Sequence, residues 1–168
     1  MKLSIILGFF HFIGPFQSLV GQTTIIDPNG DGGFENGSDF ISNGWNVVNG
    51  AATNKWFLDT IPGISNFSSK AAYISDTITG ANWNYDNSST SLVHFYRDVT
   101  FPAEETFITL SFKWQAGGEG DSWDALMVSI APSSYTPVAS GVSLGLGGLS
   151  SPATTIAQFY DYDFDSVT

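Results

Sequence analysis

The chain has 168 residues, and its 16 Asp and Glu against 5 Lys and Arg give a formal net charge of -11. Such a balance excludes an ordinary nucleic-acid-binding protein and a polybasic membrane contact, because both need Lys and Arg against phosphates. The 15% of aromatic residues exclude a disordered chain, and the absence of cysteine excludes thiol catalysis, disulfides and thiolate metal sites.

Residues 1–21 have the features of a secretory signal peptide. Lys2 supplies the positive start, and Leu3–Ile13 form an apolar run that is interrupted by a single histidine. The run is well short of the roughly 20 residues that cross a membrane, which favours a signal over a membrane anchor. We therefore expect a secreted protein whose mature domain is residues 22–168, with no transmembrane segment beyond the signal.

Beyond the signal, apolar residues alternate with polar ones over short stretches and do not recur at helical spacing. Alternation of β-branched and aromatic residues is typical of half-buried strands. In chain order, the expected strands are Trp45–Val48, Lys55–Leu58, Ala71–Ser75, Leu92–Val99, Thr106–Gln115, Ala125–Ala131 and Thr155–Tyr160. Many short strands separated by turn residues predict an all-β fold, an antiparallel β-sandwich of the jelly-roll type.

The carboxy-terminal part is less regular. Ser140–Pro152 are rich in Gly, Ser and Leu, which fits a loop, a weak strand or a linker. The chain then closes on an alternation of aromatic and acidic residues over Phe159–Asp165. A sheet that stops there keeps an open edge that pairs with other chains. We therefore expect a sandwich truncated at its carboxy end, the front part of a longer protein.

Residue types for catalysis are sparse in this sequence. Past the signal His94 is the single histidine, and no Gly-x-Ser-x-Gly element accompanies it for a Ser-His-Asp triad. Phosphate-binding glycine loops and dinucleotide fingerprints are also missing from the sequence. Acidic residues are plentiful, so a glycosidase with two facing carboxylates stays open as a minor alternative. The sequence favours a protein that is not an enzyme.

The segment Asp27–Glu35 carries oxygen ligands at alternate positions. Asp27, Asn29 and Asp31 match the start of a calcium-binding loop, in which side-chain oxygens surround a hard cation. The Glu that closes an EF-hand would fall on Ser38, so this loop is not an EF-hand. Spacing alone leaves a structural calcium site and a plain Asx-rich turn equally open.

Several motifs resemble a family of extracellular modules. The segments that carry the likeness are Gly33–Gly37 (GFENG), Asn43–Trp45 (NGW), Asn54–Trp56 (NKW), Ala71–Ser75 (AAYIS), His94–Pro102 (HFYRDVTFP), Ile108–Trp114 and Asp124–Val128. In this order they are similar to the cleaved-adhesin, or choice-of-anchor J, domains of Bacteroidetes secreted surface proteins, which are MAM-like jelly rolls. The likeness covers about residues 25–137.

The resemblance implies an adhesin-type module at the outer cell surface, exported by type IX secretion. It also implies a structural calcium beside the first strand, with Glu35 as a ligand and Asp27 or Asp31 as helpers. The sequence departs from the family in lacking the carboxy-terminal sorting signal and the last strand with its closing Asp.

Three aromatic residues, Trp83, Tyr85 and Trp123, are candidates for ligand contacts because Asn and Asp residues flank them. Aromatic faces beside such groups suit stacking on sugars or packing against a protein partner, and the alternative is a role in loop packing. We expect a non-catalytic extracellular binding or adhesion module that recognises carbohydrate or protein. The alternative is an accessory domain of a secreted hydrolase or peptidase whose catalytic part lies outside this chain.

Overall fold

The computed structural model of the protein describes residues 23–60, 69–76, 84–115, 123–140 and 151–160. The elements are η1 (a 3-10 turn, Ile41–Asn43), β1 (Asn46–Val48), β2 (Lys55–Asp59), β3 (Ala71–Ser75), β4 (His94–Tyr96), β5 (Ala125–Ile130) and β6 (Thr154–Tyr160). The predicted signal peptide lies outside the described residues. In the described ranges, no helix has the length and hydropathy of a membrane span.

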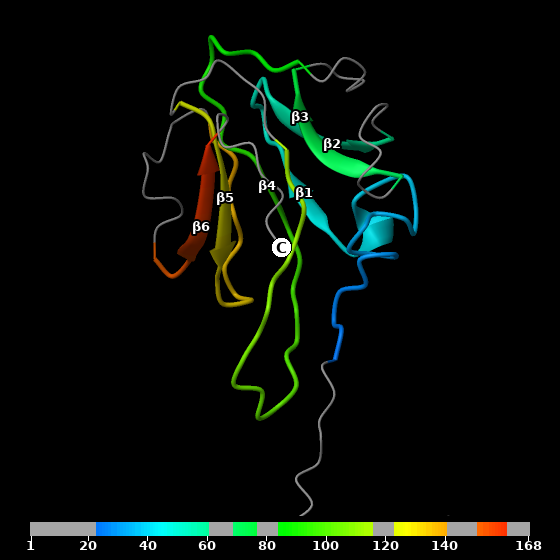
Figure 1. Ribbon diagram of the computed structural model, residues 1–168. Coiled ribbons are helices and arrows are strands. Elements are labelled where there is room, and N and C mark those ends of the chain that lie inside the picture. The colour runs from blue at the N-terminus through cyan, green and yellow to red at the C-terminus, as the bar shows by residue number, and fades with distance from the viewer. Residues whose placement is uncertain (1–22, 61–68, 77–83, 116–122, 141–150, 161–168) are drawn as a thin grey trace, which may run out of the picture.

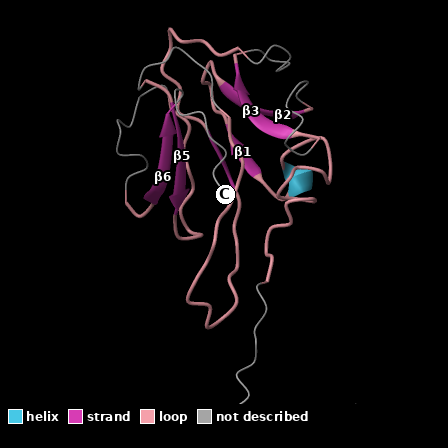
Figure 2. Ribbon diagram, viewed as in Figure 1, coloured by secondary structure: helices cyan, strands magenta, loops and turns pink. Residues whose placement is uncertain are grey.

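The strands form antiparallel pairs: β1 with β4, β2 with β3, and β5 with β6. In Figure 1, β5 and β6 are drawn at one side, β2 and β3 at the other, and β1 and β4 between them. Loops connect these short strands, and η1 is the helical element of the described residues (Figure 2). The described residues therefore form small antiparallel sheets with almost no helix, which is compatible with an all-β fold.

Most of the predicted strands are confirmed. The strand at Ala71–Ser75 has the predicted bounds, and those beginning at Lys55 and Ala125 differ from the prediction by one residue at their ends. The strand predicted over Leu92–Val99 is shorter than expected, since β4 covers its middle and Leu92 forms an isolated bridge with Ser140. The alternation of apolar and polar residues therefore located most strands. The ends of each strand depend on how many of its residues form hydrogen bonds with a neighbouring strand.

The strand predicted at Thr106–Gln115 is wrong, because these residues are not assigned to any strand. The second half of this segment nevertheless has alternating burial: Phe112 and Trp114 are covered, whereas Ser111, Lys113 and Gln115 are exposed. Phe112 and Trp114 pack against Phe159 of β6, with ring centroids 5.7 and 4.7 Å apart, and Trp114 is only 7% exposed. A strand needs a hydrogen-bonding neighbour, and periodicity in one segment does not supply it.

Residues 97–115 form what we call the arm. They leave β4, extend beyond the strands and return toward β5 (Figure 1). A turn lies near its tip, where the Glu105 N–H donates to the Pro102 carbonyl at 3.4 Å. Its exposed apolar side chains are Phe101, Phe107, Ile108 and Leu110. Ile108 and Leu110, which alternate in step with Phe112 and Trp114, are thus exposed, whereas Phe112 and Trp114 pack against Phe159.

Aromatic rings form the core beneath the amino-terminal loops. Phe95 of β4 contacts four other rings, with centroids 4.8 to 6.2 Å away: Phe34, Phe40, Trp45 and Trp56. Several of these contacts are edge-to-face, which adds about 0.5–1.5 kcal/mol per pair beyond the area buried. Phe34 reaches the cluster from a left-handed backbone position, with φ of 62°. This conformation costs a non-glycine residue on the order of 1 kcal/mol or more, so the ring cluster holds it in place.

Candidate functional site

The opening loop, Asp27–Glu35, is closed by hydrogen bonds within itself. The Asp27 carbonyl accepts the N–H groups of Gly30 and Gly32 at 3.1 and 2.8 Å, and Asp27 Oδ1 accepts the Asn29 N–H at 2.9 Å. A Cβ on Gly32 would lie 2.8 Å from that carbonyl oxygen, so only glycine fits this turn. The Asx-rich turn that the sequence left open is therefore present.

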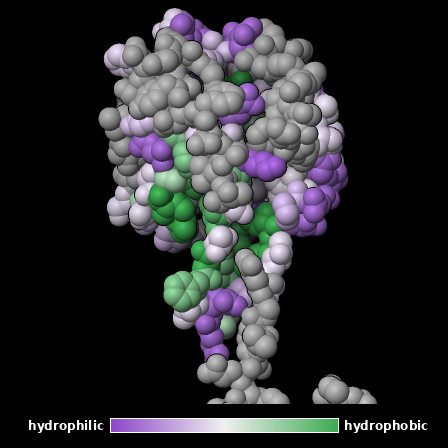
Figure 3. Space-filling view, in the orientation of Figure 1, coloured by the Kyte–Doolittle hydropathy of each residue, from purple (hydrophilic) through white to green (hydrophobic). Residues whose placement is uncertain are grey.

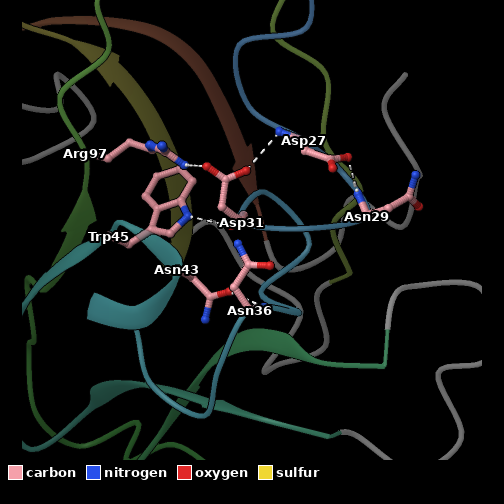
Figure 4. Close-up of polar contacts among 7 residues, drawn as sticks. All are labelled: Asp27, Asn29, Asp31, Asn36, Asn43, Trp45 and Arg97. Carbon is pink, nitrogen blue, oxygen red and sulfur yellow. Dashed lines mark hydrogen bonds and ion pairs between the residues drawn. The ribbon is translucent and has the colours of Figure 1, made fainter.

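Asp31 lies at the centre of the polar contacts drawn in Figure 4. Its Oδ1 accepts the Asp27 N–H at 2.9 Å, and its Oδ2 forms an ion pair with Arg97 Nη1 at 2.7 Å. The Trp45 indole donates to the Asp31 carbonyl at 3.1 Å. Partial burial raises the pKa of Asp31, but the hydrogen bonds from Arg97 and Asp27 outweigh it and hold the pKa below its ordinary value.

Asn43, in η1, ties two turns of the opening region together from a fully buried position. Its Nδ2 donates to the Asp39 carbonyl at 2.8 Å, and its Oδ1 accepts the Asn36 N–H at 2.9 Å. Figure 4 shows the amide directed at Asn36 beneath the Asp31 contacts. Gly44 follows with φ of 73° and ends the 3-10 turn, since its N–H donates to the Ile41 carbonyl.

Glu35 binds the segment that precedes β3. Its Oε2 accepts the Ser69 hydroxyl at 2.5 Å, and its Oε1 accepts the Lys70 N–H at 3.3 Å. The Ser69 hydroxyl, together with the backbone donors and the Lys70 charge, lowers the pKa of Glu35. Lys70 Nζ in turn donates to the Gly37 carbonyl. Glu35 therefore joins the opening loop to the start of β3.

The carboxylates predicted to bind calcium, those of Asp27, Asp31 and Glu35, do not share a centre. Within the described ranges, no group of three or more His, Cys, Asp or Glu side chains is placed to hold a metal ion. All three already accept hydrogen bonds from the protein, and Asp31 also pairs with a guanidinium. Calcium takes six to eight oxygen ligands. The residues in this arrangement do not fit the ion, and calcium binding stays a prediction from the sequence.

Of the predicted ligand-binding aromatics, Tyr85 and Trp123 lie on different segments of the described chain. Trp123 lies two residues before the start of β5 and is 78% exposed. Tyr85 is partly buried in a segment that Asn54 holds, since the Asn54 side chain donates to the Asp86 carbonyl at 2.8 Å and accepts the Asp86 N–H at 2.7 Å. Trp83 lies outside the described residues. Trp123 is thus the most accessible of the candidates whose structure is described.

The described surface also has a shallow depression of about 230 Å³. It is lined by small and weakly polar residues: Ala51, Ala52, Thr53, Thr90, Ala139 and Ser140. Ligand sites usually combine apolar or aromatic walls with a few directed polar groups. This lining supplies no ring and no charged group, so the depression is a weaker candidate than Trp123.

Arg97 is the functional group that the sequence reasoning missed. It is the only arginine in the chain, and it falls within the HFYRDVTFP segment that carries the family likeness. A lone arginine in so acidic a chain is a signal for an ion pair, although its partner, 66 residues away, cannot be read from spacing. Comparisons with protein-family models, curated proteins and solved structures found no match.

Proposed function

We propose that this protein is a non-catalytic binding or adhesion module, exported to the outer cell surface and folded as a jelly-roll sandwich of the cleaved-adhesin type. The short antiparallel strands support the sandwich, and the ordered motifs from GFENG to HFYRDVTFP support the family. The signal-like residues 1–21 support export. The ligand is a carbohydrate or a protein at the cell surface.

The exposed indole of Trp123 carries the proposal. Trp is among the residues most enriched at binding hot spots, because a large rigid ring gains much contact area at little entropic cost. The backbone beside it is held by the β5–β6 pairing, in which Ala125 lies opposite Tyr160. A ring that is 78% exposed next to a paired strand is accessible for stacking on a sugar or packing against a protein.

In the proposed module, His94 has a structural role. The imidazole is about half-buried, and its Nε2 lies 3.3 Å from the Val138 carbonyl oxygen. Burial lowers the pKa of His94, which keeps the ring neutral. A ring directed at a backbone carbonyl in this way joins β4 to the segment after β5.

The proposal is tested by screening the chain against arrayed glycans and intact cell-surface proteins, followed by titration of each hit. We expect Trp123→Ala to weaken binding by at least about 30-fold, since hot-spot truncations cost about 2 kcal/mol or more. Ile41→Ala is the matched control, because Ile41 is also 78% exposed but lies in η1. It should leave affinity unchanged.

Circular dichroism of both variants checks that the fold persists. Glycan hits that Trp123→Ala abolishes identify a carbohydrate ligand, and protein hits with the same dependence identify a protein ligand. Equal affinity of the Trp123 and Ile41 variants, or no binding by the unaltered chain in either screen, contradicts the proposal.

A further inference from the structure

The Arg97 side chain has three close neighbours, of which Asp31 belongs to the opening loop. Its Nη1 lies 2.7 Å from Asp31 Oδ2, and its Cζ lies 5.2 Å from the centroid of the Trp45 ring. Its Nη2 faces Gly44, where a Cβ would come within 3.4 Å. The side chain is only 17% exposed and that of Asp31 25%, so water screens this pair less than a surface ion pair. A planar guanidinium suits such a position between a carboxylate and an aromatic face.

The Asp31–Arg97 pair links segments that lie far apart in sequence. Trp45 binds to both partners, because its indole N–H donates to the Asp31 carbonyl while its ring lies under the guanidinium. The same ring packs against Phe95, with centroids 5.2 Å apart. The guanidinium therefore connects the opening loop to the end of β4 and to the aromatic core. A structural metal ion would connect the same segments.

A second cation lies beside the other predicted metal ligand. The Lys70 N–H donates to Glu35 Oε1, and the Lys70 ammonium donates to the Gly37 carbonyl. Arg97 thus forms an ion pair with one carboxylate of the opening loop, and the positive charge of Lys70 acts on another, that of Glu35, although its ammonium binds the Gly37 carbonyl. A calcium ion entering here would have to displace Arg97 from Asp31 and would be repelled by both side chains.

We propose that Arg97, assisted by Lys70, takes the place of a metal ion in the opening loop, so that the loop stays assembled without calcium. Extracellular calcium sites bind with dissociation constants of about 10⁻⁴–10⁻³ M, so a loop held by such a site opens when calcium is scarce. An internal guanidinium cannot be lost by dilution. The module therefore keeps its opening loop and the rings beneath it in place at any calcium concentration.

The test is thermal unfolding of the chain in millimolar calcium and in excess chelator. We expect the unaltered protein to have the same midpoint in both solutions. Arg97→Met should lower the midpoint by about 5–10 °C in both, because it leaves the Asp31 carboxylate partly buried without its partner. Lys113→Met is the matched control, since it removes one positive charge from an exposed position on the arm, and it should lower the midpoint less than Arg97→Met does.

The double variant Asp31→Asn/Arg97→Met should regain part of the lost midpoint, since no uncompensated carboxylate remains. If Arg97→Met does not fold at all, this double variant and Arg97→Lys give the comparison. The proposal is overturned if calcium raises the unfolding midpoint of the unaltered protein and Asp31→Asn or Glu35→Gln abolishes that rise. Equal midpoints for Arg97→Met and Lys113→Met overturn it as well.

Discussion

At the residue scale, acidic side chains of this protein serve as acceptors for its own backbone. Asp39 Oδ1 accepts the Ser42 N–H at 2.7 Å, and Asp86 Oδ1 accepts the Ser88 N–H at 2.9 Å. Ser42 lowers the pKa of Asp39 chiefly through its backbone N–H, and Ser88 lowers that of Asp86 chiefly through its hydroxyl. Much of the acidic composition thus forms local turns, in which Asp is favoured for this reason.

The sequence identified the type of the residues in the opening loop but not their partners. Asp27 and Asn29 contact each other locally, in the Asx turn that was one of the two alternatives their spacing left open. Asp31 and Glu35 bind residues far away in the sequence, and they diverge from each other for that reason. Periodicity and spacing report on neighbours along the chain, whereas these contacts depend on how distant segments meet.

His94 gives a prediction for the pH dependence of stability. Its folded-state pKa lies below the ordinary value of 6.5, so the unfolded chain takes up a proton first as the pH falls. The free energy of unfolding should therefore decrease as the pH falls below about 6.5, before the carboxylates titrate near pH 4. Denaturant unfolding at several pH values between 7 and about 5 measures this slope.

His94→Gln is the comparison, because it keeps a polar side chain but does not titrate. It should show a smaller decrease in stability over the same pH range. No other histidine of residues 22–168 contributes in this window, since the second one of the chain lies within the predicted signal. An identical pH slope for both proteins would mean that His94 is as accessible to protons in the folded state as in the unfolded state.

At the element scale, asparagine side chains reinforce strand pairs that are marginal by themselves. A two-stranded sheet has little independent stability in water. Asn49 accepts the Trp56 N–H at 2.7 Å and donates to the Trp56 carbonyl at 3.0 Å, which fixes the start of β2 against the preceding turn. In that turn, a Cβ on Gly50 would lie 2.9 Å from Ala139 Cβ, so the residue must be glycine.

Asn54→Ala should free the segment around residues 84–91. Asn54 is buried and makes both a donor and an acceptor bond with the backbone of Asp86. Losing both bonds leaves buried backbone groups without partners, and we expect the free energy of unfolding to fall by about 2–3 kcal/mol. Hydrogen exchange should become faster at Asp86 and its neighbours, and mass spectrometry of peptides measures it.

Thr53→Ala is the control for this change, because Thr53 is the exposed neighbour of Asn54. It should alter stability by no more than about 0.5 kcal/mol. Slow exchange over residues 84–91 in the Asn54 variant would show that other contacts hold the segment.

At the scale of the whole molecule, the arm is the main departure from a covered core. Figure 3 shows apolar side chains gathered where the arm emerges from the strands. Phe107 is 88% exposed, and Phe101, Ile108 and Leu110 are also exposed. Exposed clusters of this kind raise the tendency to associate, while a net charge of -11 keeps molecules apart.

The double variant Phe107→Ser/Ile108→Ser should reduce binding of a hydrophobic fluorescent dye and slow aggregation at high salt, where charge repulsion is screened. Its free energy of unfolding should stay within about 1 kcal/mol of the unaltered protein, because both side chains are already exposed. Ile41→Ser, in η1, should change dye binding less. A loss of several kcal/mol in the double variant would show that the arm is packed in solution.

The sequence by itself determined the all-β class and the positions of most strands, because the alternation of apolar and polar side chains is a pattern of a few neighbouring residues. For Asp27–Glu35 it left an Asx turn and a calcium site equally open, and the structure shows the turn. The tertiary structure decided that β1 pairs with β4 and β5 with β6. It decided too that Asp31 meets Arg97 instead of Glu35, and that Thr106–Gln115 has no strand partner. Such contacts join segments that are distant in the chain. Local periodicity does not indicate which strand a given strand pairs with, or which charged residue lies beside a given carboxylate.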